Sequence, residues 1–189
     1  MSSVEEFTVS VSSSEDAEDA GVVGTLVEIV NMAYSRGEEG MWKGNAKRTT
    51  LGEMAAHLKR GEILIARSSV EVAGSIFVNP FFEENIGELG MLCVAEKFLR
   101  RGLGKMLVHA AEVHCKSVAS CKHMRLELLT PAAYIHPVKA WLDKWYTSMG
   151  YVKGTPENFD LHPTLSYTQG YRGLGCKSTF SGVHISLPA

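Results

Sequence analysis

Two glycines stand within a basic segment of the chain, Arg100-Arg101-Gly102-Leu103-Gly104-Lys105. A strand-like run, Ile86–Val94, precedes this segment, and apolar residues recur at helical spacing from Leu103 to Val113. The N-terminus of a helix presents free backbone N–H groups, and glycines let a phosphate oxygen approach the backbone closely. The segment therefore predicts an anion site, to which two arginines and a lysine add positive charge.

Other phosphate-binding motifs fit this segment poorly. A P-loop would need glycine in place of Leu99 and serine or threonine in place of Met106. A dinucleotide-binding fingerprint would need a small residue where Leu107 stands. A second glycine-rich run, at residues 170–175, is followed by no helical pattern, so we interpret it as a turn-rich connection.

Two histidines and two cysteines lie close together in the sequence, at His114, Cys115, Cys121 and His123. They straddle the predicted end of a helix and the start of a strand, so a tetrahedral zinc site is geometrically conceivable. Packing of a helix face explains them better, and no metal is predicted. The four cysteines form no CxxC pair, a pattern typical of reduced thiols in a cytoplasmic protein.

The elements that must position the basic segment can be predicted from periodicity and capping signals. Phe7–Val11 alternates as a strand, and Val23 to Ala33 has helical spacing after a carboxylate-rich start. Thr50-Leu51-Gly52-Glu53 has the form of a capping box and begins a second helix, which Gly61 ends. Residues 62–67 and 71–78 are typical of a hairpin.

The second half of the chain continues the alternation of strands and helices. We expect a loop at residues 80–85, a strand at 124–129, and a helix that His136-Pro137 opens and Gly150 ends. The tail beyond Tyr151 should be irregular until a last strand at residues 177–187. The hairpin excludes a purely parallel sheet, so a mixed α/β sheet with helices on both faces follows. With no repeat and no linker, residues 1–189 are expected to form one domain.

Composition narrows the function classes. The formal net charge of −2 and the absence of a long basic run argue against nucleic acid or an anionic membrane as partner. The N-terminal residues lack the features of a secretory signal, and the longest apolar-rich stretch, residues 21–34, is too short to span a bilayer. We therefore expect a cytoplasmic protein.

The order of strand, basic Gly-x-Gly segment and helix, followed by a strand and a helix ending Trp145-Tyr146-Thr147-Ser148-Met149-Gly150-Tyr151, resembles the GNAT superfamily of general-control-related N-acetyltransferases. It is similar to the family's pyrophosphate motif, Arg/Gln-x-x-Gly-x-Gly/Ala, and to its Tyr-x-x-x-Gly-Phe/Tyr signature. The run from His136-Pro137-Val138-Lys139 onward also resembles one subgroup of the family. The resemblance implies an α/β GNAT fold, with a mixed, mostly antiparallel sheet flanked by helices on both faces.

The resemblance also implies a coenzyme A site. Leu92, Cys93 and Val94 would pair through their backbone with the pantetheine amides, and the Val94 N–H would stabilise the oxyanion. The pyrophosphate would be held by Arg100, Arg101, Gly102, Leu103, Gly104 and Lys105. Two residues depart from the family pattern: Leu99 stands where arginine or glutamine is usual, and Lys139 stands where many members carry an asparagine that contacts the pantetheine arm.

Two residues take catalytic roles by the same resemblance. Tyr146 matches the family's proton donor to the departing thiolate, and otherwise would be a core aromatic beside Trp145. Glu88 lies six residues before Val94, where histone-type members keep a general base, and otherwise would be a surface carboxylate. Cys93 is not expected to act as a nucleophile, because no histidine is locally placed to activate it.

The loop from Tyr34 to Lys43 lies where the family covers its acceptor site. Glu38, Glu39 and Trp42 could hold a cationic amine through charge and cation–π contacts, or could be solvated loop residues. His136 could be a second base or a helix cap.

These observations predict an acetyl-CoA-dependent N-acetyltransferase that acts on the primary amine of a small molecule, by direct attack in a ternary complex. A protein N-terminus or lysine as acceptor, a longer acyl donor, and a non-catalytic CoA-binding sensor are the alternatives. Acetyl-CoA is the expected co-substrate, and the sequence leaves a homodimer open.

Overall fold

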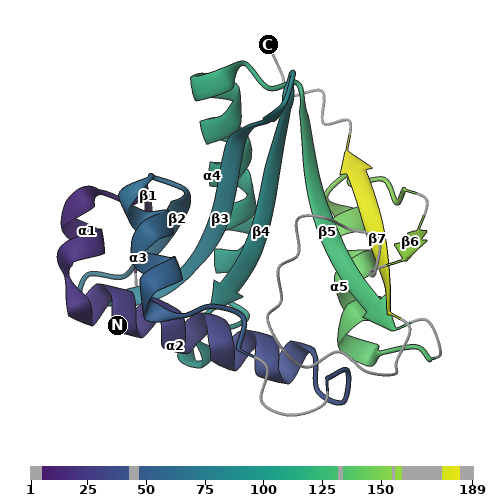
Figure 1. The fold of residues 1–189 in the computed structure, drawn as a ribbon, viewed down its shortest axis with the longest axis horizontal. Coiled ribbons are helices and arrows are strands. Elements are labelled where there is room, and N and C mark those ends of the chain that lie inside the picture. The colour runs from purple at the N-terminus through teal and green to yellow at the C-terminus, as the bar shows by residue number, and fades with distance from the viewer. Residues whose placement is uncertain (1–5, 43–46, 132–133, 155, 159–175, 184–189) are drawn as a thin grey trace, which may run out of the picture.

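The computed structural model describes residues 6–42, 47–131, 134–154, 156–158 and 176–183. Its strands form one seven-stranded sheet in the order β1-β2-β3-β4-β5-β7-β6, in which β4 and β5 are parallel and all other neighbours antiparallel. The elements follow the chain (Figure 1) as β1 (Thr8–Val11), α1 (Ser14–Glu18), α2 (Ala20–Gly37), α3 (Leu51–Lys59), β2 (Ile63–Arg67), β3 (Val72–Glu83), β4 (Ile86–Val94), η1 (Glu96–Phe98), α4 (Leu103–Ala119), β5 (His123–Pro131), α5 (Pro137–Ser148), β6 (Pro156–Asn158) and β7 (Cys176–Val183).

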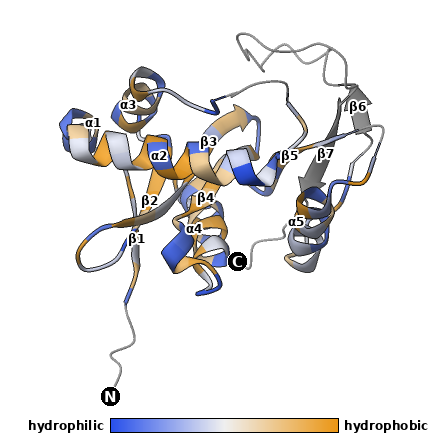
Figure 2. Ribbon diagram, turned by 90° about the horizontal axis from the view of Figure 1, so that it is seen from below, coloured by the Kyte–Doolittle hydropathy of each residue, from blue (hydrophilic) through white to orange (hydrophobic). Residues whose placement is uncertain are grey.

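Helices cover both faces of this sheet. Figure 2 shows α1, α2 and α3 on one face and α4 on the other. The two faces bury separate apolar clusters. On one face, the helices α2 and α3 pack on the sheet through Leu26, Val30, Met54 and Leu58, with Ile65 of β2 in the same cluster. The α4 face buries Leu89, Leu103, Leu107, Met124 and Leu126. The predicted fold class is confirmed.

Local capping explains where the first helices begin. Thr50 Oγ1 accepts from the Glu53 N–H at 3.3 Å, and the Glu53 carboxylate accepts from the Thr50 N–H at 2.9 Å. This is the capping box that the sequence predicts, and each reciprocal bond satisfies a donor that the helix itself leaves unpaired. Asp19 caps α2 in a simpler way, because its carboxylate accepts from the N–H groups of Gly21 and Val22.

The predicted loop at residues 80–85 is wrong in most of its length. Strand β3 continues through Pro80 to Glu83, and only Glu84 and Asn85 turn before β4 begins. The β3–β4 register shifts between Asn79 and Glu83, so Pro80 lies in a bulge. Proline is tolerated there because a bulged residue does not need to donate to the ladder.

The C-terminal region agrees with the sequence in part. Strand β7 pairs antiparallel with β5, as an extension of the sheet, and overlaps the predicted last strand. The tail is not irregular throughout, because Pro156–Asn158 pairs with β7 as strand β6. The glycine-rich run at 170–175 and the end of the predicted strand, beyond Val183, lie outside the described residues. Among those described, no helix has the length and apolar character needed to cross a membrane.

Strands β3 and β4 lie very close together at Gly74. A Cβ added to Gly74 would lie 2.5 Å from the backbone oxygen of Cys93 and 3.1 Å from Cα of Val94. Backbone atoms cannot swing aside as a side chain can. Any larger residue at this position must therefore push the end of β4 away from β3.

We expect Gly74→Ala to lower the free energy of unfolding by about 1–3 kcal/mol, the usual cost of overpacking. Gly24→Ala is the matched control, because nothing lies within 4 Å of its added Cβ inside α2. That change should stabilise by up to about 1 kcal/mol, since alanine favours a helix interior over glycine. Urea unfolding measures the free energy of unfolding of both variants. Equal unfolding midpoints would contradict the close approach of β3 and β4 at Gly74.

Candidate active site

A β-bulge in β4 determines the geometry of the candidate site. Phe77 of β3 is opposite Gly90, but Ser75 is opposite Cys93, so β4 has one residue more than β3 over this interval. The extra residue is accommodated at Met91, which has a φ of 43°. A bulge bends the strand and shifts its side chains to the other face. Cys93 accordingly packs in the cluster under α2.

Just before the bulge, β4 separates from β5. Their parallel pairing runs from Ile86 opposite His123 to Leu89 opposite Leu126 and extends no further in the described chain, and the two strands diverge from there (Figure 1). A cleft of about 1090 Å³ opens between them. Its walls include Leu89–Val94 of β4 and Leu126–Leu129 of β5, and α2 and α5 contribute side chains.

One edge of β4 faces this cleft with its backbone groups. The Ala95 N–H donates to the Ala73 carbonyl at 2.8 Å, so it points toward β3. Because successive N–H groups of an extended strand point to opposite edges, the Val94 N–H points toward the cleft.

The basic Gly-x-Gly segment lies at the end of the cleft where α4 begins. Gly102 has a φ of 83° and is the N-cap residue of α4, and no side chain caps the first turn. Arg100, which also has a positive φ of 63°, and Lys105 are exposed and line the cleft, together with Gly102, Leu103 and Gly104. The first-turn N–H groups of a helix with no side-chain cap are suited to bind an anion.

Arg101 is the exception among the predicted anion-binding residues. It does not line the cleft, and its guanidinium lies 5.4 Å from the centre of the Phe98 ring. Of the two arginines in the basic Gly-x-Gly segment, Arg100 therefore lines the cleft and Arg101 does not.

Tyr146 lines the cleft from α5 and is 8% exposed. The rings of Trp145 and Tyr151 pack edge-on against it, with centroids 4.9 Å and 5.6 Å away. Within the described part of the chain, its hydroxyl has no hydrogen-bond partner. Burial raises the pKa of Tyr146, and the nearby Tyr34 raises it further, so the phenol remains protonated at neutral pH.

Glu88 lies on the sheet face opposite α4, where it is half-buried and paired in register with Arg125. Burial raises its pKa to about 7, the Glu127 and Glu83 carboxylates act in the same direction, and Arg125 opposes them. Arg125 is itself 3.2 Å from Glu127. Glu88 does not line the cleft, whereas Glu127 does.

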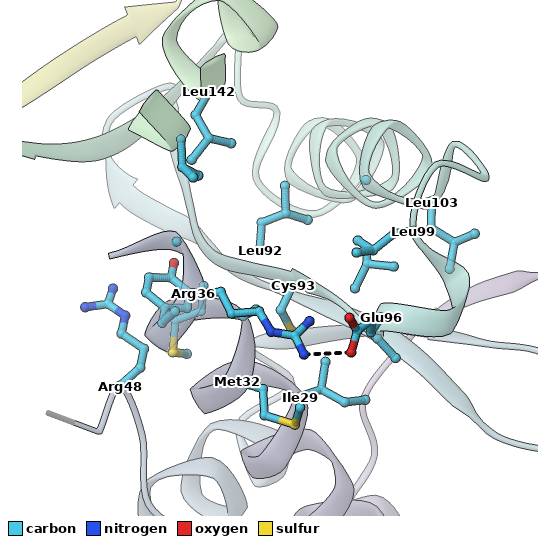
Figure 3. Close-up of a pocket in the computed structure, with 18 of the residues that line it drawn as sticks. Ile29, Met32, Arg36, Arg48, Leu92, Cys93, Glu96, Leu99, Leu103 and Leu142 are labelled. Carbon is cyan, nitrogen blue, oxygen red and sulfur yellow. Dashed lines mark hydrogen bonds and ion pairs between the residues drawn. The ribbon is translucent and has the colours of Figure 1, made fainter. Parts of the chain in front are cut away.

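Neither Glu127 nor Tyr34 was predicted from the sequence to have a role of its own in the site. Both line the cleft, and Tyr34 lies beneath the Arg48 guanidinium, 4.8 Å from the ring centre. The only signal for Glu127 was the polar alternation of Arg125 and Glu127 within the predicted strand. An ion pair between Arg36 and Glu96, 2.6 Å apart, adds a further contact beside the cleft, close to Met32 of α2 (Figure 3).

The residues predicted to hold an amine are bonded to one another. Lys139 Nζ lies 2.8 Å from one oxygen of Glu38, and Trp42 Nε1 donates to the other at 2.6 Å. The side chains of Lys139 and Glu38 are only 6% and 12% exposed. Both carboxylate oxygens of Glu38 are therefore occupied, and the Lys139 ammonium is held by Glu38, although both residues line the cleft.

His136 extends this network without lining the cleft. It is the N-cap residue of α5, but its side chain makes no capping bond; instead its Nε2 lies 3.1 Å from the Glu39 carbonyl oxygen. Glu39 and Trp42 also lie outside the cleft lining. The contacts of Glu38 with Lys139 and of Glu39 with His136 thus fasten the turn after α2 to the start of α5.

Two chemistries receive no support from the described residues. The Cys93 thiol contacts Ser75 Oγ at 3.3 Å, and burial raises its pKa to about 11, which disfavours a thiolate nucleophile. No group of three or more histidine, cysteine, aspartate or glutamate side chains in this part of the chain is arranged to hold a metal ion.

Solved structures similar to this one share its fold. The ribosomal-protein-S18-alanine N-acetyltransferase of Escherichia coli has 14% identity and a TM-score of 0.63, with 97% of each chain covered. A Salmonella typhimurium protein named yncA, described as an acetyltransferase and solved with its cofactor acetyl-CoA, has 13% identity and a TM-score of 0.64, with 97% of this chain and 96% of that chain covered.

A third similar structure is the N-acetylglutamate synthase of Neisseria gonorrhoeae, complexed with coenzyme A and N-acetyl-glutamate. It has 13% identity and a TM-score of 0.59, and the match covers 96% of this chain and 36% of that chain. At these identities the structures show a common fold. No curated protein matches the sequence significantly.

The family assignment rests on the sequence as well as on the fold. The model of the Acetyltransferase (GNAT) family matches residues 26–135, more than half of the chain. The matched region contains the bulged strand, the cleft wall and the basic Gly-x-Gly segment. The chain therefore belongs to the acetyltransferase (GNAT) family.

Proposed function

We propose that this protein is an acetyl-CoA-dependent N-acetyltransferase that acetylates a primary amine of a small molecule by direct attack in a ternary complex. The observation that carries the proposal is the cleft between β4 and β5, with an anion-binding helix start at one end and a buried tyrosine in its wall. The yncA protein and the N-acetylglutamate synthase, which share the fold, were solved with acetyl-CoA and coenzyme A.

In this proposal the cofactor lies along β4. The pantetheine amides pair with the backbone of Leu92, Cys93 and Val94, as an added strand would. The pyrophosphate binds the N–H groups at the start of α4, and Arg100 and Lys105 neutralise its charge. The Val94 N–H, which points toward the cleft, donates to the thioester carbonyl oxygen and stabilises the oxyanion that develops there.

Tyr146 and a carboxylate move the two protons of the reaction. The neutral amine nitrogen attacks the thioester carbon, and collapse of the tetrahedral intermediate breaks the carbon–sulfur bond. The second proton that the nitrogen loses in forming the amide replaces the one that Tyr146 gives to the thiolate. The thiolate, with a thiol pKa of about 8.5, accepts a proton from the Tyr146 hydroxyl, which burial keeps protonated. A substrate ammonium, with a pKa of about 10, first gives a proton to a carboxylate, for which we propose Glu88. Because Glu88 does not line the cleft, the proton would reach it through a water.

The contacts of the turn after α2 favour a small acceptor over a protein segment. The buried pair between Glu38 and Lys139 joins the end of α2 to α5 across the cleft lining. A second tie runs from His136 to the Glu39 carbonyl. An extended peptide would need this edge to be open, whereas a small amine fits beneath it.

The first prediction of this proposal concerns the anion site. Gly102→Asp should abolish binding of acetyl-CoA, because it places a side chain and a negative charge where the pyrophosphate would sit. Gly52→Asp is the matched control: it adds the same charge at an exposed position in α3 with nothing within 4 Å. Calorimetric titration measures the affinity of both variants for acetyl-CoA. If Gly102→Asp binds acetyl-CoA as tightly as the wild type does, the anion site is refuted.

The second prediction concerns the proton donor. Tyr146→Phe keeps the packing against Trp145 and removes only the hydroxyl, so kcat should fall by about 10²-fold with little change in the KM for acetyl-CoA. Tyr151→Phe is the comparison, because the Tyr151 hydroxyl donates to Glu112 away from the cleft. It should lower stability and leave turnover intact. Steady-state kinetics with full turnover in Tyr146→Phe would return Tyr146 to a packing role.

The third prediction concerns the base and its neighbour. With the pKa of Glu88 near 7, the wild-type rate should fall as the pH drops through that value and protonates the carboxylate. Glu88→Gln should lose most activity near neutral pH and recover partly at high pH, where free amine is abundant.

Glu127→Gln supplies the control for this assignment. It removes a negative charge that raises the pKa of Glu88, so the acid limb of the pH–rate profile should move to lower pH. The reverse pattern would make Glu127 the base: activity lost in Glu127→Gln, and in Glu88→Gln only a shift of the acid limb of the pH–rate profile.

The acceptor and the acyl donor can be identified by screening amines and peptides for CoA release, with acetyl-CoA and with longer acyl-CoAs.

A further inference from the structure

Two tryptophans on α5 form a stacked pair at the outer part of the cleft. Trp141 and Trp145 are one helical turn apart, with ring centroids 5.9 Å apart and planes at 17°. Both line the cleft. Trp141 is 57% exposed, which is unusual for the largest apolar side chain and leaves much of its ring surface accessible.

This pair lies directly beside the anion site. A Cβ built on Gly104, in the first turn of α4, would lie 3.4 Å and 3.5 Å from two ring carbons of Trp145. Trp145 therefore packs on the backbone that we assign to the pyrophosphate, and Trp141 is the next ring outward. A group joined to a pyrophosphate bound at Gly102–Lys105 would reach the rings first.

The exposed fraction of these aromatic side chains rises along α5 from Tyr146 to Trp141. Tyr146 is 8% exposed, Trp145 is half-buried, and Trp141 is 57% exposed. In the proposed function the reacting end of the cofactor lies at the buried Tyr146, whereas Trp141 lies more than one helical turn away and is exposed to solvent.

We propose that Trp141, supported by Trp145, stacks on the adenine base of the cofactor and selects CoA over pantetheine thioesters that lack a nucleotide. The inference rests on the proposed function. A purine has two flat faces that stack well on an indole ring, with a contribution that corresponds to about a tenfold or larger change in affinity per base. Arg100 and Lys105, which flank Gly102 and Gly104 and also line the cleft, complement the phosphates that join the base to pantetheine.

The test compares two ligands in several variants. Calorimetry should show that Trp141→Ala weakens CoA binding about tenfold or more and leaves the affinity for 4′-phosphopantetheine, which has no adenosine, unchanged. Trp141→Phe should retain part of the affinity, because a phenyl ring still stacks. Phe81→Ala is the control: it removes an aromatic ring that is 71% exposed and outside the cleft, and it should change neither affinity.

A spectroscopic measurement separates stacking from a structural effect. CoA should quench the tryptophan fluorescence of the wild-type protein, 4′-phosphopantetheine should not, and Trp141→Phe should lose most of the quenching. If the wild type binds CoA, two results would overturn the stacking assignment: an equal loss of affinity for both ligands in Trp141→Ala, or no loss of affinity for CoA in that variant. Failure of the wild type to bind CoA would overturn the proposed function and this inference together.

Discussion

The separation of β4 from β5 is the constraint on which the rest of the site depends. Parallel pairing ends at Leu89 opposite Leu126, two residues before the bulge at Met91. A regular sheet would have paired the cleft-facing edge of β4 with its neighbour. Because it does not, backbone groups on this edge of β4 have no strand partner in the described chain, an arrangement that would suit the extended ligand of the proposed function.

The two apolar clusters allow the strands to remain apart. On one face, α4 packs across β3 and β4, and on the other, α2 packs on the same two strands. Strand β5 is held on its far side by β7. The cleft is therefore bounded by two supported walls, and the buried contact between Glu38 and Lys139 joins α2 to α5 across it. Removing one partner of such a pair would leave a buried charge without compensation, which is strongly destabilising.

Features that depend on local sequence were predicted well. The capping box at Thr50, the helix that starts after Gly102 and the proline at the start of α5 each follow from a few neighbouring residues. Features that depend on the register between strands were not predicted well. The strand character of Pro80 requires knowledge of the bulge opposite Gly87, and the place of Glu127 in the cleft requires knowledge of where β5 leaves β4.

Long-range pairs were the least predictable part of the site. Glu38 and Lys139 are 101 residues apart, and neither position alone indicates that the two charges are buried together. The sequence suggested an open carboxylate for an amine and a lysine beside pantetheine, but the fold pairs the two. The stacked tryptophans are different, because their spacing of four residues on a helix was visible. Only their contact with Gly104 relates them to the anion site.

The environments of Tyr146 and Glu88 separate the two protonation roles that the proposed reaction needs. Burial disfavours the charged form of any group, so it raises the pKa of the phenol and of the carboxylate alike. For the phenol, whose pKa is already high, the result is a group that stays protonated and can give a proton to a thiolate. For the carboxylate, the pKa rises only to about 7, where Arg125 opposes the effects of Glu127 and Glu83. A group that titrates near neutral pH can accept a proton from an ammonium and release it again in each turnover. In the proposed reaction, the same physical effect would thus prepare Tyr146 as the acid and Glu88 as the base, because their intrinsic pKa values lie on opposite sides of neutrality.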